Sequence, residues 1–248
     1  MDSHMDPGQW IIPDWPAPVT VRAVTTTRQG GVSQGPWTSM NLADHVGDAI
    51  VDVQANRACL TERLQLPASP LWLRQVHGTR GVDAASTSRS VEADVAFATR
   101  TGVICAVLTA DCLPVLLCDT NGTRVAAAHA GWRGLVTGVV EQAVAALQAP
   151  GAELLAWLGP AIGAEAYIVG DEVREAFLDY AGEARDAFRL AATGGWHADL
   201  YQLARQRLAG CGVRAVYGGG FCTFTEQQRF FSYRRDGVTG RMASLIWL

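Results

Sequence analysis

The sequence predicts a single domain of mixed α and β structure, an α+β fold, and three observations support this. Short apolar or β-branched runs typical of strands are interspersed with segments whose apolar residues recur at helical spacing. An Asn-Gly pair at residues 121–122 separates two apolar runs, which is a strong hairpin signal. No repeat, low-complexity tract or linker divides the chain, and 49% of its residues are hydrophobic, enough to fill one sizeable core.

The elements follow from these patterns in chain order. Short runs rich in apolar and β-branched residues predict strands over residues 19–27, 71–76, 95–98, 102–108, 113–118, 124–128, 153–158, 213–217 and 242–247. Longer segments with helical spacing predict helices over residues 50–64, 135–147, 171–180 and 200–208. Asp48 lies where the first helix would have its N-cap, and the polar stretch 79–90 predicts a loop.

Composition and charge exclude several classes of function. The net charge is −4 and no basic stripe is present, so nucleic acid and anionic membranes are not expected as main partners. No run of eighteen apolar residues predicts a transmembrane helix. The six cysteines form no Cys-x-x-Cys pair, which favours a reduced, cytoplasmic setting over a disulfide framework. No feature indicates an oligomeric state, and a monomer is compatible with the sequence.

The first five residues resemble a remnant of an expression vector. We expect the native chain to begin near Met5, the catalytic domain to span residues 6–248, and His4 to carry no function. No signal peptide follows.

A glycine-rich loop follows the first predicted strand and ends near Asn41. Its glycines allow backbone N–H groups to approach a ligand closely, and Arg28 offers a guanidinium fork for phosphate. Arg28, Ser33 and Asn41 are therefore candidate substrate- or phosphate-binding residues, although the segment also fits a plain surface loop. It is not a Walker loop, because the Gly-Lys-Ser/Thr ending is absent.

Three residues at the ends of predicted strands are candidate metal ligands: His77, Cys112 and His129. If the strands on either side of the Asn-Gly turn pair, Cys112 and His129 lie at the same end of the hairpin. Catalytic zinc sites commonly use three protein ligands and keep a fourth position open for water or substrate. Arg133 opens the helix that follows His129, where it would bind an anion or form a surface ion pair.

The same residues allow two other interpretations. Cys112 could act as a nucleophile with His129 or His77 as its base, in which case Asp111 would orient the histidine. A non-catalytic role, as a buried structural zinc site or as an interaction module, is a further alternative, and a structural zinc usually has four protein ligands. His45, His197 and the other cysteines stay open as that ligand, although we interpret both histidines as structural.

Eight segments together resemble one known family, the laccase-domain or polyphenol oxidase proteins, also described as purine nucleoside phosphorylases and, in some bacteria, as a peptidoglycan-editing factor. The likeness extends over nearly the whole chain from about Val19. The segments are Thr27-Arg-Gln-Gly-Gly-Val-Ser33 with Gly35-Pro-Trp37 and Asn41-Leu, His45-Val-Gly-Asp48, Arg74-Gln-Val-His77-Gly, Thr109-Ala-Asp-Cys112-Leu-Pro-Val, His129-Ala-Gly-Trp-Arg-Gly134, Gly159-Pro-Ala-Ile-Gly163, Phe221-Cys-Thr223, and Ser232-Tyr-Arg-Arg-Asp236 with Thr239-Gly-Arg241.

The resemblance implies a metal-dependent enzyme. His77, Cys112 and His129 would be the metal ligands and the catalytic centre, with zinc as the usual metal and copper as the alternative. The implied fold is a layered α/β/β/α sandwich rather than a Rossmann sheet. The implied reactions are phosphorolysis of adenosine, inosine and S-methyl-5′-thioadenosine, which makes purine nucleosides and phosphate the partners, and deamination of adenosine.

The laccase label itself fits the sequence poorly. A four-copper oxidase needs about ten histidine ligands, many in His-x-His pairs, whereas the chain has five histidines in all, and no such pair. Nucleoside chemistry is therefore our main prediction. A copper-dependent polyphenol oxidase and an amidase that edits peptidoglycan precursors are the alternatives.

Overall fold

The computed structural model describes residues 10–87 and 90–248, so the predicted vector remnant and His4 lie outside the described residues. Its largest unit is a six-stranded sheet in the order β11-β7-β5-β6-β3-β2. Pairing is antiparallel except between β7 and β11 and between β2 and β3. In chain order its strands are β2 Gly81–Asp83, β3 Val95–Ala98, β5 Leu113–Asp119, β6 Val125–Ala130, β7 Leu154–Leu158 and β11 Ala215–Gly218.

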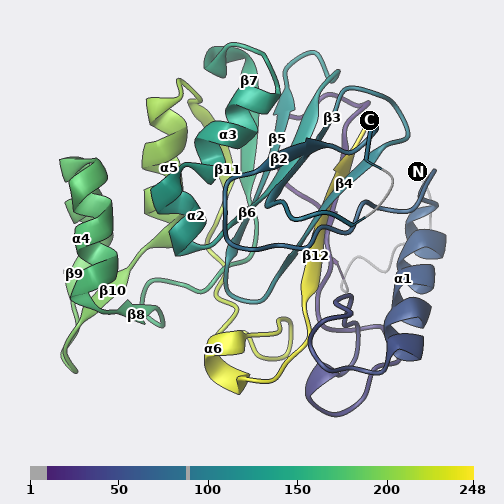
Figure 1. Ribbon diagram of the computed structural model, residues 1–248, viewed down its shortest axis with the longest axis horizontal. Helices are drawn as coiled ribbons and strands as arrows, with labels where there is room; N and C mark the ends of the chain where they lie inside the picture. The colour runs from purple at the N-terminus through teal and green to yellow at the C-terminus, as the bar shows by residue number, and fades with distance from the viewer. Residues whose placement is uncertain (1–9, 88–89) are drawn as a thin grey trace.

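A second, three-stranded sheet in the order β1-β12-β4 packs face to face on the first. Its strands are β1 Arg22–Thr25, β4 Ile104–Thr109 and β12 Met242–Trp247. Helix α1, Ile50–Leu64, covers the outer face of this sheet, on the right in Figure 1. The outer face of the six-stranded sheet is covered by α2 Trp132–Thr137, α3 Val139–Ala146 and α5 Leu200–Gly210. The layers thus run helix, sheet, sheet, helix, which confirms the predicted α/β/β/α sandwich.

Side-chain alternation along the strands builds the three layers of core. In β4, Cys105 and Val107 pack between the two sheets, while Ile104 and Ala106 pack toward α1. Strands β5 and β6 alternate in the same way between the inter-sheet core and the helix-covered face. These strands are buried on both faces, which explains their continuous apolar runs in the sequence.

A small sheet in the order β8-β10-β9 and helix α4 project to one side of the sandwich, on the left in Figure 1. The remaining elements are β8 Ile168–Val169, β9 Phe188–Leu190, β10 Trp196–Ala198, α4 Asp171–Tyr180, α6 Tyr233–Asp236 and the 3-10 helices η1 Gly35–Trp37, η2 Gly151–Glu153 and η3 Gly182–Ala187. No helix in the described parts of the chain is long and apolar enough to cross a membrane.

The structure corrects several predicted elements. Residues 71–76 make only isolated bridges at Leu71 and Arg74 instead of a strand. The helix predicted over 135–147 is two helices, because Gly138 has φ 102°, a conformation that ends α2 and begins α3. The N-cap of α1 is Ala49, and the Asp48 side chain instead binds the loop before it.

Candidate metal centre

Pairing of β5 with β6 places Cys112 and His129 at one end of the hairpin, as predicted. Leu113 lies opposite Ala130 and Pro114 opposite His129. Cys112 directly precedes β5, and His129 is the second-last residue of β6, so both lie at the same edge of the six-stranded sheet. The connection at the far end of the hairpin, residues 120–124, contains the Asn-Gly pair and is held by hydrogen bonds from the Thr123 and Arg124 N–H groups to the Asp119 carboxylate.

His77 joins them from a loop that is distant in the sequence. Its Nε2 lies 3.8 Å from Sγ of Cys112, and its ring centroid is 4.8 Å from that of His129. One ligand atom from each of the three residues lies within 4.8 Å of the others. His77 is exposed, Cys112 is partly exposed and His129 is buried, so the group is open to solvent on one side.

Asp94 holds the two histidines in position, a role that no sequence motif predicted. The carboxylate is fully buried and accepts a 2.7 Å hydrogen bond from Nδ1 of His129, which leaves Nε2 free to face the group. It also accepts backbone N–H bonds from Val76, His77 and Gly78 at 3.2, 3.0 and 2.8 Å. One buried carboxylate therefore orients the imidazole of His129 and holds the backbone of the loop that carries His77.

The backbone beside Cys112 takes an unusual conformation. Asp111 has φ 90°, rare for a residue with a side chain, and it is held there by hydrogen bonds to both carboxylate oxygens. Oδ1 accepts from Thr223 Oγ1 at 2.6 Å and Oδ2 from the Arg234 backbone N–H at 2.7 Å. Asp111 therefore anchors the turn before Cys112 and does not orient a histidine, which corrects the role considered for it.

Gly131 leaves space for His77, Cys112 and His129, the three candidate ligands that form the cluster. A Cβ atom at this position would lie 2.9 Å from Cδ2 of His77 and 3.0 Å from Sγ of Cys112, closer than real Cβ contacts. A side chain on the residue after β6 would therefore displace His77 and Cys112 from these positions. This explains the glycine two residues after His129 by packing rather than by turn geometry.

The electrostatics of the cluster favour an ionised thiol. Withdrawal from water by itself raises the pKa of Cys112, but the nearby His129 and His77 outweigh it and lower the pKa to about 6. Burial lowers the pKa of His129, and the charge of Cys112 and the hydrogen bond to Asp94 outweigh that and raise it to about 9. A thiolate is the form of cysteine that binds metal.

The lowered pKa gives a test that does not depend on turnover. In metal-free protein, alkylation of Cys112 by iodoacetamide should rise with pH and reach half its maximal rate near pH 6, instead of near the ordinary thiol value of 9. Zinc at stoichiometric concentration should slow the reaction at least ~10-fold, because a coordinated sulfur is a poor nucleophile. Peptide mass spectrometry after timed alkylation measures both effects. An unchanged rate with zinc would argue against coordination by Cys112.

The cluster lies in a cleft of about 620 Å³, a volume typical of small-molecule sites. Its walls include several aromatic and cationic side chains. Its lining residues include Trp132, Arg133, Tyr167, Tyr233, Arg234 and Arg241. Desolvation raises the pKa of Tyr167, so its phenol stays neutral and can donate a hydrogen bond.

The predicted anion-binding residues do not all lie in this cleft. Arg133 lines it, next to Trp132. Ser33 and Asn41 are 0% exposed, and both donate a hydrogen bond to the Asp48 carboxylate. Asn41 also donates to the Ala43 carbonyl oxygen. They have no surface with which to contact a ligand, which corrects the prediction.

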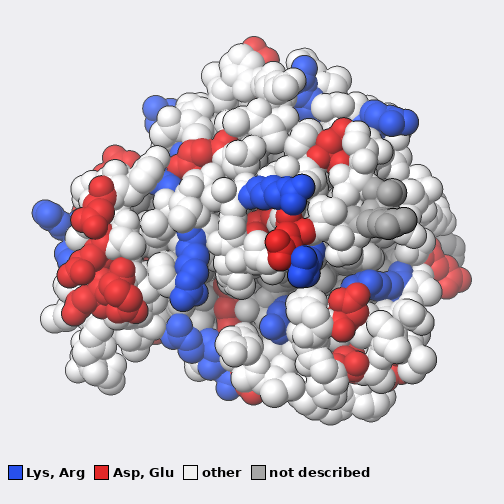
Figure 2. Space-filling model, in the orientation of Figure 1, with Lys and Arg blue, Asp and Glu red and all other residues white. Residues whose placement is uncertain are grey.

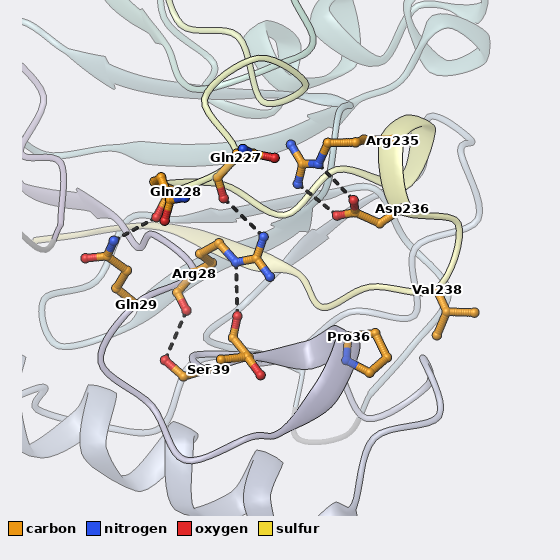
Figure 3. Close-up of a pocket in the computed structure, with 10 residues that line it drawn as sticks. Arg28, Gln29, Pro36, Ser39, Gln227, Gln228, Arg235, Asp236 and Val238 are labelled. Atoms are coloured by element: carbon orange, nitrogen blue, oxygen red, sulfur yellow. Dashed lines mark hydrogen bonds and ion pairs between the residues drawn. The ribbon is translucent and has the colours of Figure 1, made fainter.

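Arg28 lies in a separate hollow of about 650 Å³, shown in Figure 3. Its guanidinium donates to the carbonyl oxygens of Thr38 and Gln227 at 3.0 and 3.1 Å. The Arg235–Asp236 ion pair forms another part of the wall (Figure 3). Arg28, a predicted phosphate-binding residue, therefore lies outside the cleft of the three candidate ligands.

The other histidines do not complete a four-ligand site. Within the described residues, the group of candidate ligands around Cys112 consists of the three residues already named. His45 lines the cleft and pairs with Asp44 at 3.5 Å. His197 lies with Nδ1 3.1 Å from the Ala164 carbonyl oxygen, a structural contact. This geometry favours an open, three-ligand site over a closed structural one.

Comparisons with known proteins find relatives over nearly the whole chain. A family model described as "Multi-copper polyphenol oxidoreductase laccase" matches residues 22–248. The chain is 57% identical to a Pseudomonas aeruginosa protein named purine nucleoside phosphorylase, covering 96% of this chain and 98% of the relative. It is 51% identical to Escherichia coli YfiH, which carries the same name, over 96% and 98%. A crystal structure of a Neisseria meningitidis DUF152 protein superposes with a TM-score of 0.93 at 50% identity, covering 97% and 99% of the two chains.

Proposed function

The chain belongs to this laccase-like family, and from that premise we propose that it is a zinc-dependent purine nucleoside phosphorylase that also deaminates adenosine. Its substrates would be adenosine, inosine and S-methyl-5′-thioadenosine, each cleaved by phosphate to a free base and a ribose 1-phosphate. We infer the phosphorylase activity from the names of the relatives. The observation on this chain that carries the proposal is the three-ligand cluster inside a cleft of nucleoside size.

The residues of the cluster fit a zinc ion. One thiolate and two imidazoles are a donor set that zinc accepts, and three protein ligands leave a position open. His77, Cys112 and His129 would hold the ion, with Asp94 as the hydrogen-bond partner that orients His129. When bound, the ion supplies Lewis-acid chemistry, polarising whichever oxygen or nitrogen atom fills its open position. Copper binds the same donors, so the donor set favours zinc without excluding copper.

The chain's own residues have separate tasks in this proposal. Asp94 keeps the proton of His129 on Nδ1, so that Nε2 stays directed at the cluster. The neutral phenol of Tyr167 offers a hydrogen-bond donor to a substrate in the cleft. In phosphorolysis a phosphate oxygen forms a bond to C1′ while the C1′–N9 bond breaks. The electron pair of the C1′–N9 bond leaves with the purine, which then takes up a proton. The cationic side chains of the cleft would bind the phosphate.

A four-copper oxidase finds little support in the arrangement of ligands. The trinuclear cluster of such an enzyme needs many imidazoles close together, whereas the described residues bring together one group of two histidines and one cysteine. One copper ion could bind there, but electron relay between several coppers would have no second group of ligands in the described part of the chain.

An assay with and without phosphate tests the proposal. Zinc-loaded protein should convert inosine to hypoxanthine and ribose 1-phosphate only when phosphate is present, and should convert adenosine to inosine without it. Chromatographic separation of nucleosides and bases measures both products. Turnover of a muropeptide precursor or a phenol, with no release of purine base under any condition, would replace this proposal by the amidase or the oxidase.

A further inference from the structure

The cleft around the three ligands has an excess of cationic side chains. Arg133, Arg234 and Arg241 line it, and none of the three forms an ion pair with a carboxylate among the described residues. The carboxylate that lines the same cleft, Asp111, already accepts hydrogen bonds on both oxygens. In Figure 2, arginine side chains, drawn in blue, lie near α2 and near α6 on this face of the molecule. Three guanidinium groups without carboxylate partners suit an anionic ligand.

Arg241 is the most firmly positioned of the three. Its Nη1 donates to the carbonyl oxygens of Thr239 and Gly240 at 2.9 and 3.0 Å, while Nε and Nη2 have no hydrogen-bond partner among the described residues. Arg241 lines the same cleft as His77, Cys112 and His129, so its guanidinium shares that space with the three candidate ligands. A guanidinium fixed along one edge presents the other edge for two parallel bonds to an oxyanion.

Arg234 supports the same position from α6. Its Nη1 donates to the Ile168 carbonyl oxygen at 2.9 Å, and its Cζ lies 5.1 Å from the centroid of the Tyr167 ring. Its backbone N–H binds Asp111, the residue directly before Cys112. The turn that carries a metal ligand and the helix that carries Arg234 are thus joined by a hydrogen bond. Arg133 is exposed, as Arg234 is, but its guanidinium contacts the Trp132 ring at 4.4 Å and has no hydrogen-bond partner among the described residues.

We propose that Arg241, assisted by Arg234, forms the subsite that holds inorganic phosphate beside the metal cluster. This assignment rests on the proposed phosphorylase function and specifies which arginines serve it. Phosphate at neutral pH is a compact anion with one or two negative charges, and two guanidinium groups with free N–H donors can match its charge and several of its oxygens. The nucleophilic oxygen would then be held in the cleft that also contains the nucleoside, which the Arg28 hollow cannot achieve.

Steady-state kinetics of Arg241→Gln, with phosphate as the varied substrate, tests the subsite. The KM for phosphate should rise at least ~10-fold, since a bidentate charged contact is lost, and the KM for inosine should change by less than ~3-fold. Arg241→Lys keeps the charge but lacks the two-pronged guanidinium, so its KM for phosphate should lie between that of the wild type and that of Arg241→Gln. Arg22→Gln, on the exposed side of β1, is the matched control and should leave both constants unchanged. Zinc content and thermal midpoint verify that each variant is folded.

Several outcomes would overturn the assignment. An unchanged KM for phosphate in Arg241→Gln does so, as does a tenfold rise in Arg28→Gln alone. If the wild type shows no phosphate-dependent turnover, the proposed function fails, and calorimetric titration with inorganic phosphate still decides the subsite. Binding to wild type that is lost in Arg241→Gln supports it, whereas equal binding, or none to wild type, refutes it. If Arg241→Gln does not fold, Arg234→Gln is judged by the same criteria.

Discussion

Replacing Cys112 with alanine is expected to lower both phosphorolysis and adenosine deamination by roughly 10³-fold or more. The thiolate is the anionic member of the proposed donor set, and without it two neutral imidazoles would hold a divalent ion weakly. Loss of the ion removes several kcal/mol of charge stabilisation from the transition state. Product analysis at saturating inosine and at saturating adenosine, together with elemental analysis for zinc, measures the effect.

Cys59→Ala is the matched control for this variant. Cys59 is also a partly exposed free cysteine, but it lies in α1 on the opposite outer layer of the sandwich. Its replacement should change neither zinc content nor activity. If Cys112→Ala loses one activity and keeps the other at the normal rate, the two reactions do not share one metal centre. If it keeps both, the centre is not where the reactions occur.

Replacing Asp94 with alanine should destabilise the protein and weaken zinc binding together. Removing one partner of a buried charged pair costs about 3–5 kcal/mol, and the backbone N–H groups of Val76, His77 and Gly78 lose their acceptor as well. Without the hydrogen bond from Nδ1, His129 is free to adopt the wrong tautomer and orientation, and such changes typically reduce metal affinity 10- to 100-fold. Urea denaturation and zinc titration measure the two effects separately.

Asp119→Ala separates the role of Asp94 from a general effect of losing a buried carboxylate. Asp119 is also buried and accepts hydrogen bonds from Thr123 and Arg124, in the turn at the far end of the hairpin. Its replacement should lower stability and leave zinc affinity unchanged. Equal loss of zinc affinity in both variants would mean that Asp94 acts only through the stability of the fold.

Local sequence signals predicted the part of the site that a single hairpin builds. Asn121-Gly122 between two apolar runs fixed the pairing of β5 with β6, and that pairing alone brings Cys112 close to His129. The helices over 50–64 and 171–180 were equally clear, because their apolar residues recur at regular spacing over ten residues or more. The layered order of the sheets came from the family resemblance.

Groups that act across long distances in the sequence were not visible in this way. Asp94 lies in a short polar stretch with no motif of its own, and its role appears only when β3 packs beside β6. Arg241 and Arg234 reach the cleft from the C-terminal segment. Arg28 had a convincing local setting, a glycine-rich loop, but its guanidinium is directed to carbonyl groups of Thr38 and Gln227 in another hollow. Composition of a loop does not reveal which cavity it borders.

Zinc X-ray absorption spectroscopy tests the central claim, that His77, Cys112 and His129 hold one metal ion, most directly. In protein loaded with one equivalent of zinc, the account predicts one sulfur neighbour at about 2.3 Å and imidazole nitrogens at about 2.0–2.1 Å. The sulfur signal should disappear in Cys112→Ala and persist in Cys59→Ala. A zinc spectrum without sulfur in the wild-type protein, or one unchanged by Cys112→Ala, would contradict the account.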